Sequence, residues 1–118
     1  MRPGWLELLF WACVFASMDF LYRGYSFGMD NHAIQLPIIK AWADPFLFPG
    51  DHMVETRFQY FTIYYPLLGW LHRLIPDLQS MLLVLHMLTK VLTYLSFAAL
   101  AREFLRQRAL VIVASMLF

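Results

Sequence analysis

Apolar residues form three long runs along the 118-residue chain, and these runs define the elements that the sequence predicts. The runs cover residues 5–22, 58–75 and 80–101. A helix that crosses a membrane needs about 20 predominantly apolar residues, because each residue adds about 1.5 Å and the hydrocarbon core is about 30 Å thick. The run 80–101 is the clearest span, since His86 and Lys90 are its strongly polar interruptions.

A fourth apolar run, residues 109–118, stops after ten residues. Ten helical residues rise about 15 Å, roughly half of what a bilayer demands. We therefore expect this run to be the start of a third membrane helix, and the remainder of a longer chain to follow it.

The distribution of basic residues decides how many of the three long runs cross. Arg102, Arg106 and Arg108 form the densest basic cluster, and the positive-inside rule places such a cluster in the cytoplasm. Arg2 places the N-terminus on the same side. A chain that starts inside and is inside again at residue 102 has crossed an even number of times, so two of the runs span.

The run 58–75 is the one that we expect not to span. It carries Pro66 near its centre together with Gln59, His72 and Arg73, and it is rich in aromatic residues. This composition is typical of a helix at the lipid boundary. Pro66 would also remove a backbone hydrogen bond from a buried span, whereas water satisfies the freed carbonyl at the surface.

The predicted fold class is therefore all-α: a single incomplete polytopic membrane domain over residues 1–118. Two full transmembrane helices, 5–22 and 80–101, enclose an external loop, 23–79, that holds interfacial helices at about 31–43 and 58–75. A multi-pass protein of the bacterial inner (plasma) membrane is the expected setting.

Composition agrees with a lipid-bilayer partner and excludes nucleic acid. Hydrophobic residues make up 61% of the chain and charged residues 14%, against nearly half and about a quarter in ordinary soluble domains. The net charge of +1 gives no electrostatic reason to bind nucleic acid. The lone Cys13 forms neither an internal disulfide nor a two-thiolate zinc site.

The first loop helix is predicted from its cap and its apolar face. Asp30 suits the N-cap of a helix that ends at Ala43, and Ile34, Ile38 and Trp42 fall on one side of it. Pro37 fits better near a helix start, so the regular part shortens to 37–43 in the alternative interpretation.

Carboxylates and imidazoles are concentrated in two clusters of the loop. Asp30 is the candidate catalytic base or metal ligand, and the candidate substrate-binding residues are His32, Asp51, His52, Glu55 and Arg57. Such groups bind a divalent cation, orient an acceptor hydroxyl or deprotonate it. In the alternative interpretation Asp30 caps a helix, Asp51 makes a turn and both histidines are solvated. Spacing alone identifies no metal, because Asp-x-His is not a strong metal motif.

Among the ionisable residues of the predicted spans, Asp19, His86 and Lys90 are the informative ones. Such groups are costly in lipid and normally face a partner or a cavity. His86 and Lys90 are one turn apart, and their depths predict an Asp19–His86 contact, with Lys90 extending toward the same carboxylate. A structural polar contact between the two spans is one interpretation, and a transport pathway is the other.

Several motifs resemble the N-terminal part of uncharacterised bacterial polytopic proteins that are similar to the C-type (GT-C) glycosyltransferase superfamily. They are 25–32 (YSFGMDNH), 35–37 (QLP), 43–45 (ADP) and 48–51 (FPGD), followed by His86 and Lys90 in an apolar helix. Members of that superfamily place an acidic residue in the first external loop, and Asp30 occupies that position. Many members carry Asp-Glu there, whereas this chain has Asp30-Asn31.

The resemblance implies transfer of a sugar from a polyprenyl-phosphate donor to an acceptor on the outer face of the membrane. Asp30 would then activate the acceptor hydroxyl, or hold a cation. Two other hypotheses remain open from the sequence: a non-catalytic membrane scaffold whose loop binds a partner, and a fragment of a transporter.

Overall fold

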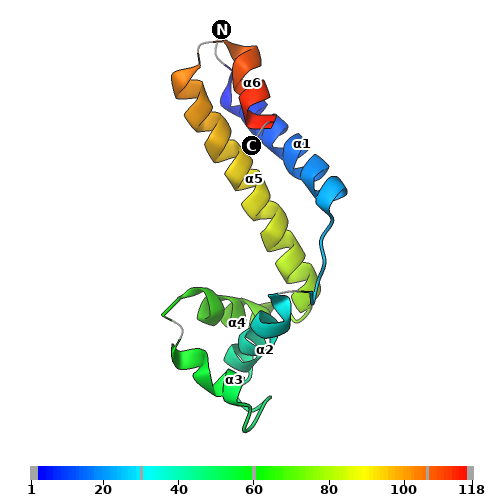
Figure 1. Cartoon of the computed structure of the whole chain (residues 1–118), viewed down its shortest axis with the longest axis vertical. Coiled ribbons are helices and arrows are strands. Elements are labelled where there is room, and N and C mark those ends of the chain that lie inside the picture. Colours follow the sequence, from blue (N-terminus) through cyan, green and yellow to red (C-terminus); the bar gives the residue numbers. More distant parts are fainter. Residues whose placement is uncertain (1–2, 30, 60, 106, 117–118) are drawn as a thin grey trace. The chain divides into compact units, whose positions relative to one another are not determined.

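The computed structural model of the chain is all-helical over the residues that it describes, which are 3–29, 31–59, 61–105 and 107–116 (Figure 1). No strand occurs within these ranges. The helices in chain order are α1 (Trp5–Arg23), α2 (His32–Ala43), α3 (His52–Glu55), the 3₁₀ helix η1 (Thr56–Gln59), α4 (Tyr64–Leu74), α5 (Leu78–Phe104) and α6 (Arg108–Met116). They divide into two compact units: residues 1–25 with 83–118, the long-helix unit, and residues 26–82, the short-helix unit.

Helices α1 and α5 are the two described helices that are long and apolar enough to cross a membrane. This confirms the prediction of two helices of that kind. The first was expected over 5–22 and runs one residue further; the second was expected over 80–101 and extends at both ends. Its start is set by Asp77, whose carboxylate accepts hydrogen bonds from the Gln79 amide at 3.2 Å and from the Ser80 hydroxyl.

The stretch predicted as one interfacial helix over 58–75 is interrupted. Helix α4 begins only at Tyr64, whose amide donates to the Thr62 hydroxyl oxygen at 3.1 Å. Pro66 thus lies in the first turn of α4, where an amide has no partner within the helix, so it removes no helical hydrogen bond. The argument from a central proline was wrong. Length separates α4 from a span instead, because its 11 residues rise only about 16 Å.

Helix α2 starts at His32, so the shortened alternative beginning at Pro37 is not what the structure has. Asn31 holds the N-cap position, and its side chain makes no capping hydrogen bond. The predicted apolar face is also shifted: Ile38, Ile39 and Ala41 are buried, whereas Ile34 is about half exposed.

The shift on α2 follows from its contact with α4. Gly69 of α4 lies directly against Trp42, and a Cβ atom at position 69 would lie 3.1 Å from the Ala43 nitrogen. Arg73 closes the same contact, since its Nε donates to the Ala43 carbonyl at 2.7 Å and its Nη2 to the Trp42 carbonyl at 3.0 Å. Helix α4 therefore packs against the C-terminal end of α2, and the residues of α2 near that end are the buried ones.

The long-helix unit has a small apolar core made by three helices. Leu8 of α1, Ala98 and Ala101 of α5 and Val111 of α6 are its buried members. Small alanines at two of these positions let the helix backbones approach closely, as is common where membrane helices pack. Helix α6 begins at Arg108, one residue before the predicted start at 109, and is described for nine residues.

Candidate functional site

Asp30, the predicted catalytic base or metal ligand, lies outside the described residues. Its neighbour His32 is placed at the first position of α2. The His32 Nδ1 accepts a hydrogen bond from the Gly28 amide at 3.2 Å, and the ring packs edge-on against Phe27. Gly28 has φ +82°, a conformation that favours glycine. His32 therefore holds the turn that leads into α2.

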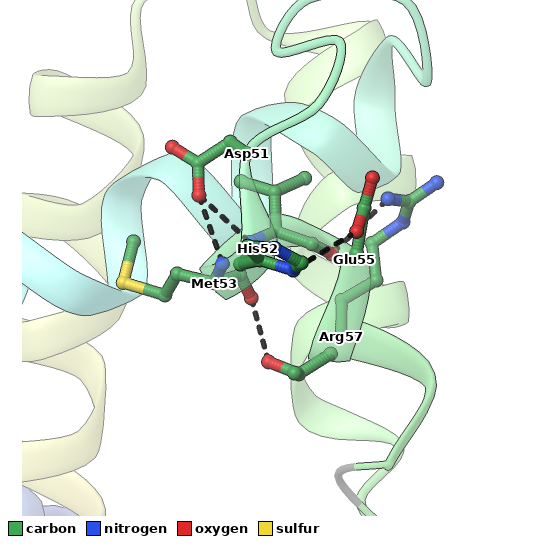
Figure 2. Close-up of polar contacts among 7 residues, drawn as sticks. Asp51, His52, Met53, Glu55 and Arg57 are labelled. Atoms are coloured by element: carbon green, nitrogen blue, oxygen red, sulfur yellow. Dashed lines mark hydrogen bonds and ion pairs between the residues drawn. The ribbon is translucent and has the colours of Figure 1, made fainter.

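Asp51 caps helix α3 (Figure 2). Its Oδ1 accepts from the Met53 amide at 2.9 Å and from the Val54 amide at 3.2 Å. These are two of the amides that a helix start leaves without an internal partner. This agrees with the alternative interpretation, in which Asp51 has a local structural role. Gly50, directly before it, has φ +78°, a conformation typical of turns.

The three other predicted binding residues lie within the next six positions, on α3 and η1. His52 Nδ1 is 3.4 Å from Glu55 Oε2, and both side chains are largely exposed. Arg57 donates from Nη1 to the Val54 carbonyl at 3.1 Å, and its guanidinium lies 4.4 Å from the centre of the Phe58 ring. Its Nε is buried without a hydrogen-bond partner.

The structure thus brings Asp51, His52, Glu55 and Arg57 together in one short stretch, as Figure 2 shows. Each of them makes a contact with its own helix turn. Within the described ranges, no group of three or more His, Cys, Asp or Glu side chains is arranged to hold a metal ion. Substrate binding by these residues stays a prediction.

The polar residues of the predicted spans do meet, in the long-helix unit. Asp19 has a side chain only 10% exposed and accepts from two cations: Lys90 Nζ is 2.7 Å from Oδ2, and Arg23 Nε is 2.8 Å from Oδ1. The contact between Asp19 and Lys90 agrees with the expected extension of Lys90 toward this carboxylate, whereas the depths predicted His86 as the partner of Asp19. It joins α1 to α5 across a long separation in sequence.

His86 is not the partner of the Asp19 carboxylate that was predicted. Its ring packs against that of Tyr25, with 5.3 Å between the ring centres. Both oxygens of Asp19 are instead engaged by the Lys90 and Arg23 cations. The long stem of Lys90 bridges the gap between helices that the shorter histidine does not.

A cavity of about 420 Å³ lies beside this ion cluster. Its lining combines the polar group of Asp19 and Arg23 with aromatic and methionine side chains: Phe15, Met18, Tyr22, Tyr94 and Met116. One carboxylate facing two cations leaves one positive charge in excess. The cluster joins helices and is poorly suited to act as a base.

Sequence reasoning missed three contacts. Arg23 is four residues after Asp19, a spacing that itself signals an ion pair on one helix face. Arg102 lies over the Trp5 ring, with its guanidinium 5.0 Å from the ring centre. The bonds from Arg73 to the end of α2 carry no sequence signal, because their acceptors are backbone carbonyls.

In comparisons with known proteins, no family model, no curated protein and no solved structure matches the chain.

Proposed function

We propose that the chain is an integral protein of the bacterial inner membrane in which α1 and α5 cross the bilayer. One observation carries the proposal: both helices are apolar and mostly bare. Only 22% of the most apolar part of α1 and 17% of that of α5 is buried in the protein. Apolar surface of this extent is stable where the surrounding medium is itself apolar.

The lengths fit that setting. The 19 residues of α1 rise about 29 Å and the 27 residues of α5 about 41 Å, against a hydrocarbon core of about 30 Å. Basic residues follow α5, so its C-terminal end is cytoplasmic by the positive-inside rule. Residues 24–77, which connect the other ends of the two helices, then lie on the periplasmic side.

The activity that we propose is transfer of a sugar from a polyprenyl-phosphate donor to an acceptor on that side. Its support is the order of elements, in which two long apolar helices enclose a segment of short helices, together with the acidic position at residue 30. Asp30 would take the proton from the acceptor hydroxyl as that oxygen attacks the sugar and the donor phosphate leaves. A positioned general base contributes about 10²- to 10⁴-fold to rate.

The test measures sugar transfer in native membranes that contain the chain. Polyprenyl-phosphate-linked mannose, glucose and arabinose, each tritiated, serve as donors, and label in membrane acceptors is counted. Asp30→Asn is expected to reduce transfer at least 100-fold without changing the amount of protein in the membrane. Asp77→Asn is the matched control, because Asp77 caps the start of α5, asparagine is as good an N-cap as aspartate, and transfer should persist. Undiminished transfer by Asp30→Asn refutes the assigned role.

A non-catalytic scaffold is the second candidate, and one observation favours it. The polar side chains of α3 and η1 contact their own helix turns, and Arg73 near the end of α4 contacts the end of α2. Side chains engaged in this way stabilise the short helices, which is the role that a scaffold requires of them. If wild-type membranes transfer label no faster than membranes lacking the protein, the scaffold hypothesis replaces the catalytic one.

A further inference from the structure

Helix α4 exposes an uninterrupted apolar stripe. Ile63, Leu67, Trp70 and Leu74 are between 53% and 80% exposed. At about 100° per residue these four positions fall within roughly 60° of one another. Ile63 belongs to the stripe although it precedes the helix, because its backbone angles are already helical (φ −77°, ψ −11°). Exposed apolar side chains are common singly, but such an ordered row marks an interaction surface.

The opposite side of α4 is occupied. Leu68 and Gly69 are buried there, with Gly69 against Trp42 of α2. Arg73, the cation near the end of α4, is held by the Ala43 and Trp42 carbonyls on that side. The stripe therefore carries no charge, and α4 is not free to turn it inward.

The chain itself restricts where the stripe lies. Only residues 75–77 separate α4 from α5. Four Cα–Cα steps reach at most about 14 Å, so the end of α4 lies within that distance of the start of α5 whatever the angle between them. If α5 crosses the bilayer, as proposed above, α4 is held at the membrane surface.

We propose that the stripe on α4 is a lipid-binding face, inserted into the headgroup region of the bilayer parallel to its plane. The inference rests on the proposed membrane insertion of α5 and adds which face of which helix meets lipid. Trp70 suits this depth, because tryptophan prefers the boundary between headgroups and hydrocarbon. A helix of this kind typically sinks about 5–10 Å below the headgroups.

Nitroxide accessibility in the full chain tests the proposal. The protein, carrying Cys13→Ala, is reconstituted in vesicles of phosphatidylethanolamine and phosphatidylglycerol. Single cysteines replace Ile63, Leu67 or Leu74 and are spin-labelled; Trp70 stays in place. Lys40→Cys, at an exposed polar position of α2, is the aqueous control. Leu92→Cys, at an exposed position of α5, is the control for membrane insertion.

The proposal requires labels on the stripe to be reached by oxygen and protected from the water-soluble nickel complex NiEDDA, at a depth between the two controls. If the stripe is as open to NiEDDA as Lys40→Cys while Leu92→Cys is protected, the lipid-binding face is wrong and membrane insertion stands. If Leu92→Cys is open as well, the proposed function fails. Labels shielded from both reagents overturn the proposal in favour of a protein partner, which dipolar broadening identifies as a second copy.

Discussion

Replacing Gly69 by alanine tests the contact on which the short-helix unit depends. A Cβ atom at position 69 would overlap the Trp42 Cβ and would lie 3.0 Å from the Trp42 carbonyl carbon and 3.1 Å from the Ala43 nitrogen. None of these atoms moves when a side chain rotates. Helices α2 and α4 must therefore separate to admit a single methyl group.

Two effects of opposite sign decide the outcome. Alanine is better than glycine inside a helix by about 1 kcal/mol, so Gly69→Ala stabilises α4 taken alone. Overpacking a close contact costs about 1–3 kcal/mol, and the upper end applies where the neighbouring atoms belong to the backbone. We expect a net loss of about 1–2 kcal/mol, which corresponds to a 5- to 30-fold change in an equilibrium constant.

Amide hydrogen exchange of the full chain in lipid nanodiscs measures this loss. The slowest amides of α2 and α4 should exchange 5- to 30-fold faster in Gly69→Ala, since local opening controls their rate. Gly4→Ala is the matched control, because a Cβ at position 4 meets nothing within 4 Å. Exchange in α2 that is unchanged or slower in Gly69→Ala would show that the helices do not approach closely at this point.

Two further predictions concern the charged groups. Asp19→Asn and Lys90→Leu should each destabilise the long-helix unit by about 3 kcal/mol, because each leaves one member of a largely buried ion pair without its partner. The double variant should lose less stability than the sum of the two single losses. Unfolding in mixed micelles measures these losses, and additive losses would contradict the ion pair. The hydrogen bond from the Ser80 hydroxyl holds the pKa of Asp77 below its ordinary 3.8. Because the folded-state pKa is lowered, this carboxylate stabilises the start of α5 fully above pH 4 and stops doing so as the pH falls through the lowered value. NMR titration should show Ser80→Ala raising the Asp77 pKa toward 3.8, and an unmoved pKa would remove Ser80 as the cause.

The long helices were predictable, and their ends were not. A run of about 20 apolar residues has few stable conformations other than a helix, which is why residues 5–22 and 80–101 were identified. The start of α5 depends instead on two hydrogen bonds to Asp77. Residues that cap helices also make turns and loops, so a sequence alone does not show which use applies.

The short helices show how a correct conclusion came in part from a wrong reason. Aromatic and polar content identified 58–75 as unlike a span, and a central Pro66 was given as a further reason. The structure places Pro66 in the first turn of α4 and leaves the helix too short to cross. The bond from the Tyr64 amide to the Thr62 hydroxyl at the start of α4 is local, but Thr62 lies one residue before the N-cap position, which Ile63 holds.

The predicted site was weakest where one residue type has two uses. Asp51 was selected as a carboxylate beside a histidine, and its Oδ1 is engaged by the Met53 and Val54 amides. A ligand-binding aspartate and a capping aspartate look alike in sequence; only the positions of the following amides separate them. Sequence reasoning could therefore nominate Asp51 and could not choose its role.

The polar residues of the two long helices were better predicted, because a charged side chain on an apolar helix has few partners within reach. An ionised carboxylate that is largely buried needs a partner, and Lys90 supplies the opposite charge on the other long helix. The structure adds Arg23, so both oxygens of Asp19 are engaged. In the transport hypothesis, a proton or cation that binds Asp19 would first have to displace Lys90 or Arg23 from the carboxylate. This geometry favours a fixed connection between α1 and α5 over the transport pathway that the sequence left open.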